Sequence, residues 1–165
     1  MENRDHWNQA VLLQPRDRLD WDVMRRALAA VIDHHDALRL RFEARHGGWH
    51  AEHGAAPAAD ALLWVRQAID RDSVTALASS AQASLSISGG LLLRAVGIDV
   101  ADGSQRFVIV IHHLVVDGVS WRILFEDIAS AYTQLAQGDA TGRASAEEPR
   151  VRAVGTALAG IRNVA

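Results

Sequence analysis

The feature that most constrains this sequence is one stretch in which an apolar strand ends in two histidines and leads into a long helix. Arg106 to Ile111 is a nearly continuous β-branched run, typical of a strand that is covered on both faces. His112-His113 follows, and Asp117-Gly118 supplies a turn. From Val119 to Gln137 apolar residues recur at three- and four-residue steps, which predicts a helix. A strand, a histidine pair and a helix are therefore predicted to meet at one junction.

The rest of the chain predicts an α/β fold. Asp20 is a good N-cap for an amphipathic helix that begins near Trp21, and Asp72-Ser73 could cap a second helix that runs through Leu85. Alternating or apolar runs predict further strands, and Gly47-Gly48 and the Asp-Gly of residues 101–104 predict tight turns. The further strands are expected at residues 6–13, 38–43, 49–53, 62–65 and 91–99. This order favours a two-layer sandwich of a mixed β-sheet and helices.

Composition excludes several classes of function. The formal net charge is -3 and no basic cluster is present, so nucleic acid is not an expected partner. The chain has no cysteine, which excludes disulfides and thiolate metal sites. No apolar run approaches the roughly 20 residues that span a bilayer, and the first residues lack the apolar core of a secretory signal. A cytoplasmic protein without membrane contact is therefore the expectation.

The histidine pair suggests acid–base chemistry. Imidazole titrates near neutral pH, with an ordinary pKa of about 6.5. Neighbouring residues on a strand point to opposite faces, so only one of His112 and His113 can face a reaction space. For the same reason the pair cannot converge on one metal ion, and no metal site is predicted. Taken alone, such a pair is more often packed polar side chains than a functional site. Asp117 could orient the turn through a buried ion pair.

The whole string is more specific than the histidine pair. His112-His113-x-x-x-Asp117-Gly118 resembles the signature of the chloramphenicol-acetyltransferase-like superfamily, which includes the condensation and epimerisation domains of non-ribosomal peptide synthetases. The continuation Val119-Ser120-Trp121 resembles the epimerisation branch. Residues 6–13, 34–42 and 90–95 are similar to other segments of these domains, in the same order. The resemblance covers residues 4–137 and implies a chloramphenicol-acetyltransferase-like half domain.

The resemblance also implies roles for individual residues. It places His113 at the reacting centre and gives His112 a supporting role in the fold. Asp117 corresponds to a structural aspartate paired with an arginine such as Arg39, and Gly118 permits a close turn into the helix. Ser120 and Trp121 belong to the branch-specific continuation. Asn8 and Gln9 could line the mouth of a substrate channel.

The implied substrate is an aminoacyl or peptidyl thioester on the phosphopantetheine arm of a carrier protein, with no cofactor bound by the chain itself. Inverting the α-carbon requires a second acid–base group, which in these domains is a glutamate of a second lobe. The resemblance stops near Gly138, so residues 1–138 are expected to form the N-terminal lobe and residues 139–165 a linker and an unassigned tail. No glutamate here can be given the opposing role, because Glu126, Glu147 and Glu148 have helix-surface or linker positions.

Three interpretations of such a lobe remain open. It is an epimerisation lobe with little activity of its own, or it assembles with a separate chain or with copies of itself, or it is a non-catalytic module that docks a carrier protein. Condensation, which forms a peptide bond by acyl transfer, is the main chemical alternative to epimerisation.

Overall fold

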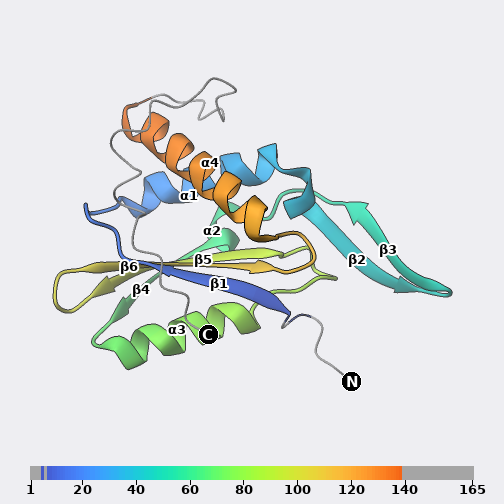
Figure 1. Ribbon diagram of the computed structural model, residues 1–165, viewed down its shortest axis with the longest axis horizontal. Coiled ribbons are helices and arrows are strands. Elements are labelled where there is room, and N and C mark those ends of the chain that lie inside the picture. The colour runs from blue at the N-terminus through green and yellow to red at the C-terminus, as the bar shows by residue number, and fades with distance from the viewer. Residues whose placement is uncertain (1–4, 6, 139–165) are drawn as a thin grey trace.

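A computed structural model of the chain describes residues 5 and 7–138, and these form a mixed β-sheet with helices on both of its faces (Figure 1). The central sheet has four strands in the order β1-β6-β5-β4, and only β4 and β5 run parallel. These strands are β1 Asn8–Leu13, β4 Leu63–Ala68, β5 Leu93–Val100 and β6 Gln105–His112. The principal helices are α1 Trp21–His34, α3 Arg71–Ala83 and α4 Gly118–Ala136. The predicted α/β class with a mixed sheet is confirmed.

The sheet separates two hydrophobic clusters, one on each face. The larger cluster joins α1 and α4 to the sheet, and the smaller one joins α3 to the opposite face (Figure 1). The molecule therefore has three layers where two were expected. The apolar run at residues 106–111 had predicted cover on both faces of this strand, because a strand that is apolar throughout is usually buried on both sides. In the structure every residue of β6 except Arg106 is buried.

The helix starts show how local sequence determines the elements. Asp20 accepts hydrogen bonds from the backbone N–H groups of Asp22 and Val23, and so begins α1 as predicted. The predicted cap of α3 was two residues late. Asp70 is the N-cap, and Ser73 is its capping-box partner: each side chain accepts from the other residue's backbone N–H.

A second, two-stranded sheet extends from the main body as a hairpin, β2 Leu40–Arg45 and β3 Gly48–His53 (Figure 1). The strand predicted from Leu38 begins later, because Leu38 is buried within a single turn of 3₁₀-helix, η2 Asp36–Arg39. A short helix, α2 Ala59–Leu62, precedes β4 and includes Leu62, which was expected to begin the strand.

Within the part of the chain that the structure describes, no helix combines the length and the apolar character needed to cross a bilayer. The linker and tail predicted at residues 139–165 lie outside the described residues.

Candidate functional site

The junction between β6 and α4 brings the predicted site residues together, except for Arg39. The backbone N–H of His113 donates to the carbonyl of Trp7, which continues the β1–β6 ladder one residue beyond β6. Alternation along this ladder places His112 opposite Asn8, on the face covered by α3, where Asn8 bonds to Gln82 of that helix. His113 lies on the other face, where α4 packs. The two histidines thus point to opposite sides of the sheet, as predicted.

His112 is a buried residue that shapes the loop after β6. Its side chain is 1% exposed. Its Nδ1 accepts a hydrogen bond of 3.2 Å from the backbone N–H of Leu114, and its carbonyl accepts from the N–H of Val115. These contacts hold the turn that leads from the strand towards α4.

His113 is half-buried, and its contacts determine which ring nitrogen carries the proton. Its Nδ1 lies 3.2 Å from the carbonyl oxygen of Val116. A carbonyl oxygen only accepts, so Nδ1 must be the protonated nitrogen that donates. In the neutral ring the lone pair is therefore on Nε2, which lies 3.3 Å from the side-chain amide nitrogen of Gln9. The indole of Trp7 lies against the imidazole, with 4.7 Å between ring centroids.

Asp117 caps α4 and does not pair with Arg39, so the expected ion pair is wrong. Its carboxylate accepts from the backbone N–H and the hydroxyl of Ser120, each at 2.7 Å. These bonds from Ser120 hold the pKa of Asp117 below its usual range. The first N–H groups of a helix have no intrahelical acceptor, and a carboxylate just before them satisfies one. Arg39 instead pairs with Asp36, three residues earlier in η2.

The expectation for Gly118 is also wrong, whereas Trp121 has a defined partner. A Cβ built on Gly118 meets no atom within 4 Å, and its φ is not positive, so neither crowding nor backbone conformation requires glycine there. The indole Nε1 of Trp121 donates to Oε1 of Gln9 at 2.6 Å, and its ring stacks on Phe125. Trp7 and Gln9 are the contacts of His113 that sequence reasoning did not find, because they depend on the β1–β6 register.

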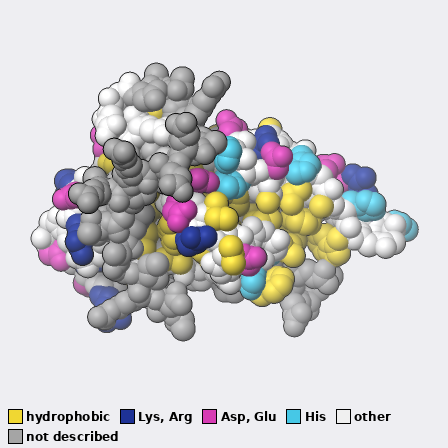
Figure 2. Space-filling view, turned by 45° about the horizontal axis from the view of Figure 1, so that its top comes forward, with side chains coloured by type: hydrophobic (Ala, Val, Ile, Leu, Met, Phe, Trp, Pro, Cys, Tyr) yellow, Lys and Arg dark blue, Asp and Glu magenta, His cyan; other side chains and the backbone are white. Residues whose placement is uncertain are grey.

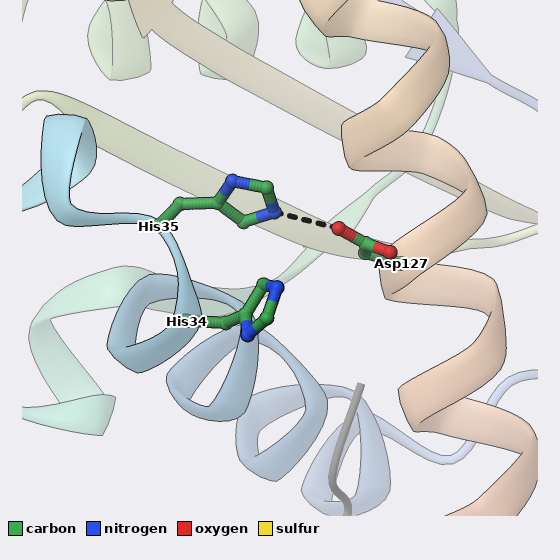
Figure 3. A group of neighbouring side chains, drawn as sticks. All are labelled: His34, His35 and Asp127. Carbon is green, nitrogen blue, oxygen red and sulfur yellow. Dashed lines mark hydrogen bonds and ion pairs between the residues drawn. The ribbon is translucent and has the colours of Figure 1, made fainter. Parts of the chain in front are cut away.

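A second group of polar side chains links α1 to α4 (Figure 3). Nε2 of His35, the C-cap residue that follows α1, lies 2.6 Å from a carboxylate oxygen of Asp127 on α4. His34 is exposed beside them, and one ligand atom from each of the three side chains lies within 4.8 Å of the others. The three residues could approach one ion, but the hydrogen bond already links His35 and Asp127, and its clear effect is to hold α4 against α1.

Exposed hydrophobic side chains lie beside His113 and on the first turns of α4. Figure 2 shows hydrophobic groups gathered on one face of the molecule beside histidines. Trp7 and Leu114, which contact or adjoin His113, are 58% and 49% exposed, and Val119 and Ile123 on the first turns of α4 are 66% and 42% exposed. We call these four residues the apolar rim. An apolar group of this kind around a polar centre is typical of a surface that meets another protein segment.

Comparison with known proteins identifies the family. The family model described as "Condensation domain" matches residues 1–148. One component of the linear gramicidin synthase of Brevibacillus parabrevis is 45% identical over 138 residues, which is 81% of this chain and 3% of that synthase component. The crystal structure of the epimerization domain from the third module of tyrocidine synthetase B matches with a TM-score of 0.74 and 34% identity, over 82% of this chain and 32% of that one.

A more distant structure extends the similarity in fold. The starter condensation domain of rhizomide synthetase matches with a TM-score of 0.66 at 22% identity, over 87% of this chain and 35% of that domain. The chain thus spans about a third of the length of these solved domains. The resemblance first seen in the string from His112 to Gly118 is confirmed: the chain belongs to the condensation domain family.

Proposed function

We propose that this chain supplies the histidine side of an epimerisation site that acts on the α-carbon of a carrier-bound aminoacyl or peptidyl thioester. The observation that carries the proposal is the hydrogen bond from Nδ1 of His113 to the Val116 carbonyl. It leaves the lone pair on Nε2, which is the state a general base requires. The 34% identity with an epimerization domain of tyrocidine synthetase B supports the choice of reaction.

The proposed step moves one proton. Nε2 of His113 takes the α-proton of the thioester, and the electron pair of the broken C–H bond passes into the thioester carbonyl as an enolate. The ring becomes an imidazolium whose Nδ1–H still donates to the Val116 carbonyl. Return of a proton to the same face restores the substrate, and protonation from the opposite face inverts it. The opposing group, a glutamate by the family resemblance, would come from outside the residues described here.

The substrate would reach His113 on the phosphopantetheine arm of a carrier protein, and the chain itself would bind no cofactor. The apolar rim would then be covered by the rest of the domain, by a separate chain or by a second copy. Each of these occupants would bury side chains that are now 42–66% exposed, which favours association.

Deuterium exchange tests the proposal without the opposing acid. A single base can exchange an α-proton with solvent and return deuterium to the same face, so the chain should introduce deuterium with retention of configuration. The assay incubates the chain with an aminoacyl thioester on a carrier protein in deuterated water, and follows mass and chirality. We expect His113→Ala to lower exchange about 100-fold or more, since general-base catalysis contributes roughly 10²–10⁴-fold.

A matched histidine variant supplies the control. His50 lies exposed on β3, in the hairpin outside the main sheet, so His50→Ala should leave exchange unchanged. Equal exchange by the wild-type chain and by His113→Ala would refute the proposed role of His113.

Condensation is the second candidate, favoured by the description of the matching family and by the shared fold of the rhizomide starter domain. The same base could deprotonate the amine of an acceptor as it attacks a donor thioester. Supplying an acceptor aminoacyl thioester separates the two reactions. Peptide formation that depends on His113, without α-deuteration, would favour condensation. Carrier binding with neither reaction would favour the docking interpretation.

A further inference from the structure

One side chain of β1 and two from the β6–α4 junction form one hydrogen-bonded series at the site. Trp121 Nε1 donates to Oε1 of Gln9 at 2.6 Å, and the amide nitrogen of Gln9 lies 3.3 Å from Nε2 of His113. The series ends where Nδ1 of His113 meets the Val116 carbonyl at 3.2 Å. Gln9 is on β1, His113 follows β6, and Trp121 is in the first turn of α4.

The two ends of this series determine the role of every atom between them. An indole N–H can only donate, so the oxygen of the Gln9 amide faces Trp121 and its NH₂ group faces His113. That NH₂ group must donate, which requires an unprotonated Nε2 on His113. At the other end the Val116 carbonyl requires a protonated Nδ1. Two independent contacts therefore select the same tautomer.

The backbone explains why these groups meet. Gln9 pairs with Ile111 in the β1–β6 register, and the ladder continues to the contact between Trp7 and His113. Gln9 is thus the diagonal neighbour of His113 on the face that α4 covers, within reach of a long side chain. On α4, stacking on Phe125 at 5.3 Å fixes the plane of the Trp121 indole. The three side chains are half-buried, so each contact replaces water that would otherwise solvate either tautomer.

We propose that Gln9 and Trp121 are positioning residues that hold His113 in the Nδ1-protonated tautomer and shield its Nε2 lone pair until a substrate displaces the amide. The consequence for catalysis rests on the proposed function, because only a base needs that lone pair. The 3.3 Å contact from Gln9 is long for a hydrogen bond, so an arriving substrate can replace it at small cost. Trp121 acts through Gln9, since its indole fixes which end of the amide faces the imidazole.

Nitrogen NMR of the resting chain tests the tautomer directly. In ¹⁵N-labelled protein at a pH where imidazole rings are neutral, two-bond ¹H–¹⁵N spectra distinguish the protonated from the unprotonated ring nitrogen. His113→Gln identifies the signals of His113 by their loss. We expect wild-type His113 to show its unprotonated signal at Nε2. A wild-type ring with the proton on Nε2 would overturn the inference.

Gln9→Glu gives the sharpest variant. Its carboxylate can only accept, so with Trp121 on one oxygen the other oxygen should draw a proton onto Nε2 of His113. We expect the unprotonated signal to leave Nε2. Gln67 is exposed on β4, at the opposite edge of the sheet, and Gln67→Glu introduces the same charge as a control. An unchanged His113 pattern in Gln9→Glu would refute the role of Gln9.

Trp121→Phe keeps an aromatic side chain and removes only the donor. Without the indole N–H the Gln9 amide can turn, so only the Val116 carbonyl still selects the Nδ1-protonated ring, and we expect an Nε2-protonated minor population to appear. This variant also serves if Gln9→Glu fails to fold. A pure Nδ1-protonated ring in Trp121→Phe would remove Trp121 from the series. The spectra require no substrate, so the expected tautomer without His113-dependent exchange would refute the proposed function and leave this inference standing.

Discussion

Replacing Gly97 on β5 with alanine adds one methyl group and tests how α1 packs on the sheet. A Cβ on Gly97 would lie 2.6 Å from both Cδ2 and Cε3 of Trp21, the first residue of α1. Carbon atoms in contact normally lie about 3.5–4.0 Å apart, so the indole must retreat by roughly 1 Å. It cannot do so freely, because its Nε1 donates to Asp99 at 3.2 Å and its ring packs on Phe107.

The expected cost of Gly97→Ala follows from these contacts. Overpacking costs about 1–3 kcal/mol, and weakening the indole hydrogen bond adds about 1 kcal/mol. Alanine in a strand recovers about 0.5–1 kcal/mol relative to glycine. The net loss in the free energy of unfolding is therefore about 1–3.5 kcal/mol, equivalent to a fall in Tm of roughly 2–14 °C for a domain of this size.

Urea denaturation followed by circular dichroism, in a double-mutant cycle with Trp21→Leu, provides the measurement. Removing the indole also removes the clash, so Gly97→Ala should cost less than about 0.5 kcal/mol in the Trp21→Leu background. Equal losses in both backgrounds, or no loss in the wild-type chain, would show that Trp21 does not lie against Gly97 as described.

Three further variants probe the supports of the site. Because Ser120 holds the pKa of Asp117 below the usual 3.8, the charged cap stabilises the fold above that pH, and this stabilisation is lost as pH falls through the lowered pKa. Asp117→Asn should therefore flatten the acid side of a profile of unfolding free energy against pH. Parallel profiles for the variant and the wild-type chain would contradict this. Asp127→Asn should lower the free energy of unfolding by about 1 kcal/mol in urea denaturation by weakening its bond to His35, an effect that His35→Ala should abolish. Arg94→Lys should lower the free energy of unfolding by about 1–3 kcal/mol in the same assay. Its buried guanidinium donates to Ser84 and Ala61 and lies 4.3 Å from the Trp64 ring centre. Arg66 lies exposed over the same ring, so Arg66→Lys is the control and should cost little.

Much of the fold could be predicted because its signals are local. The cap at Asp20 and the apolar run before His112 depend on residues within one turn or one strand, and the structure has the elements they predict. Errors arose where neighbouring residues compete for one role. Asp70 caps α3 in place of Asp72-Ser73, and Leu38 turns into the core before β2 begins.

The candidate site was predictable only in part. The string from His112 to Gly118 located the junction and the family, and alternation alone separated the two histidines. The partner of Asp117 was not predictable in this way: an acidic residue before a helix can cap it or form an ion pair, and here Ser120 takes the carboxylate while Asp36 occupies Arg39.

The sequence by itself thus determined the order of strands and helices, the histidine at the end of the buried strand and the family, since each depends on adjacent residues. Only the tertiary structure decided which ring nitrogen of that histidine carries the proton in the neutral imidazole. Gln9 and Trp121 reach His113 through the β1–β6 register and the packing of α4. Gln9 and His113 are 104 positions apart in the sequence, and no local pattern records their contact. The physical reason is that hydrogen-bond donors and acceptors are assigned by their partners in space.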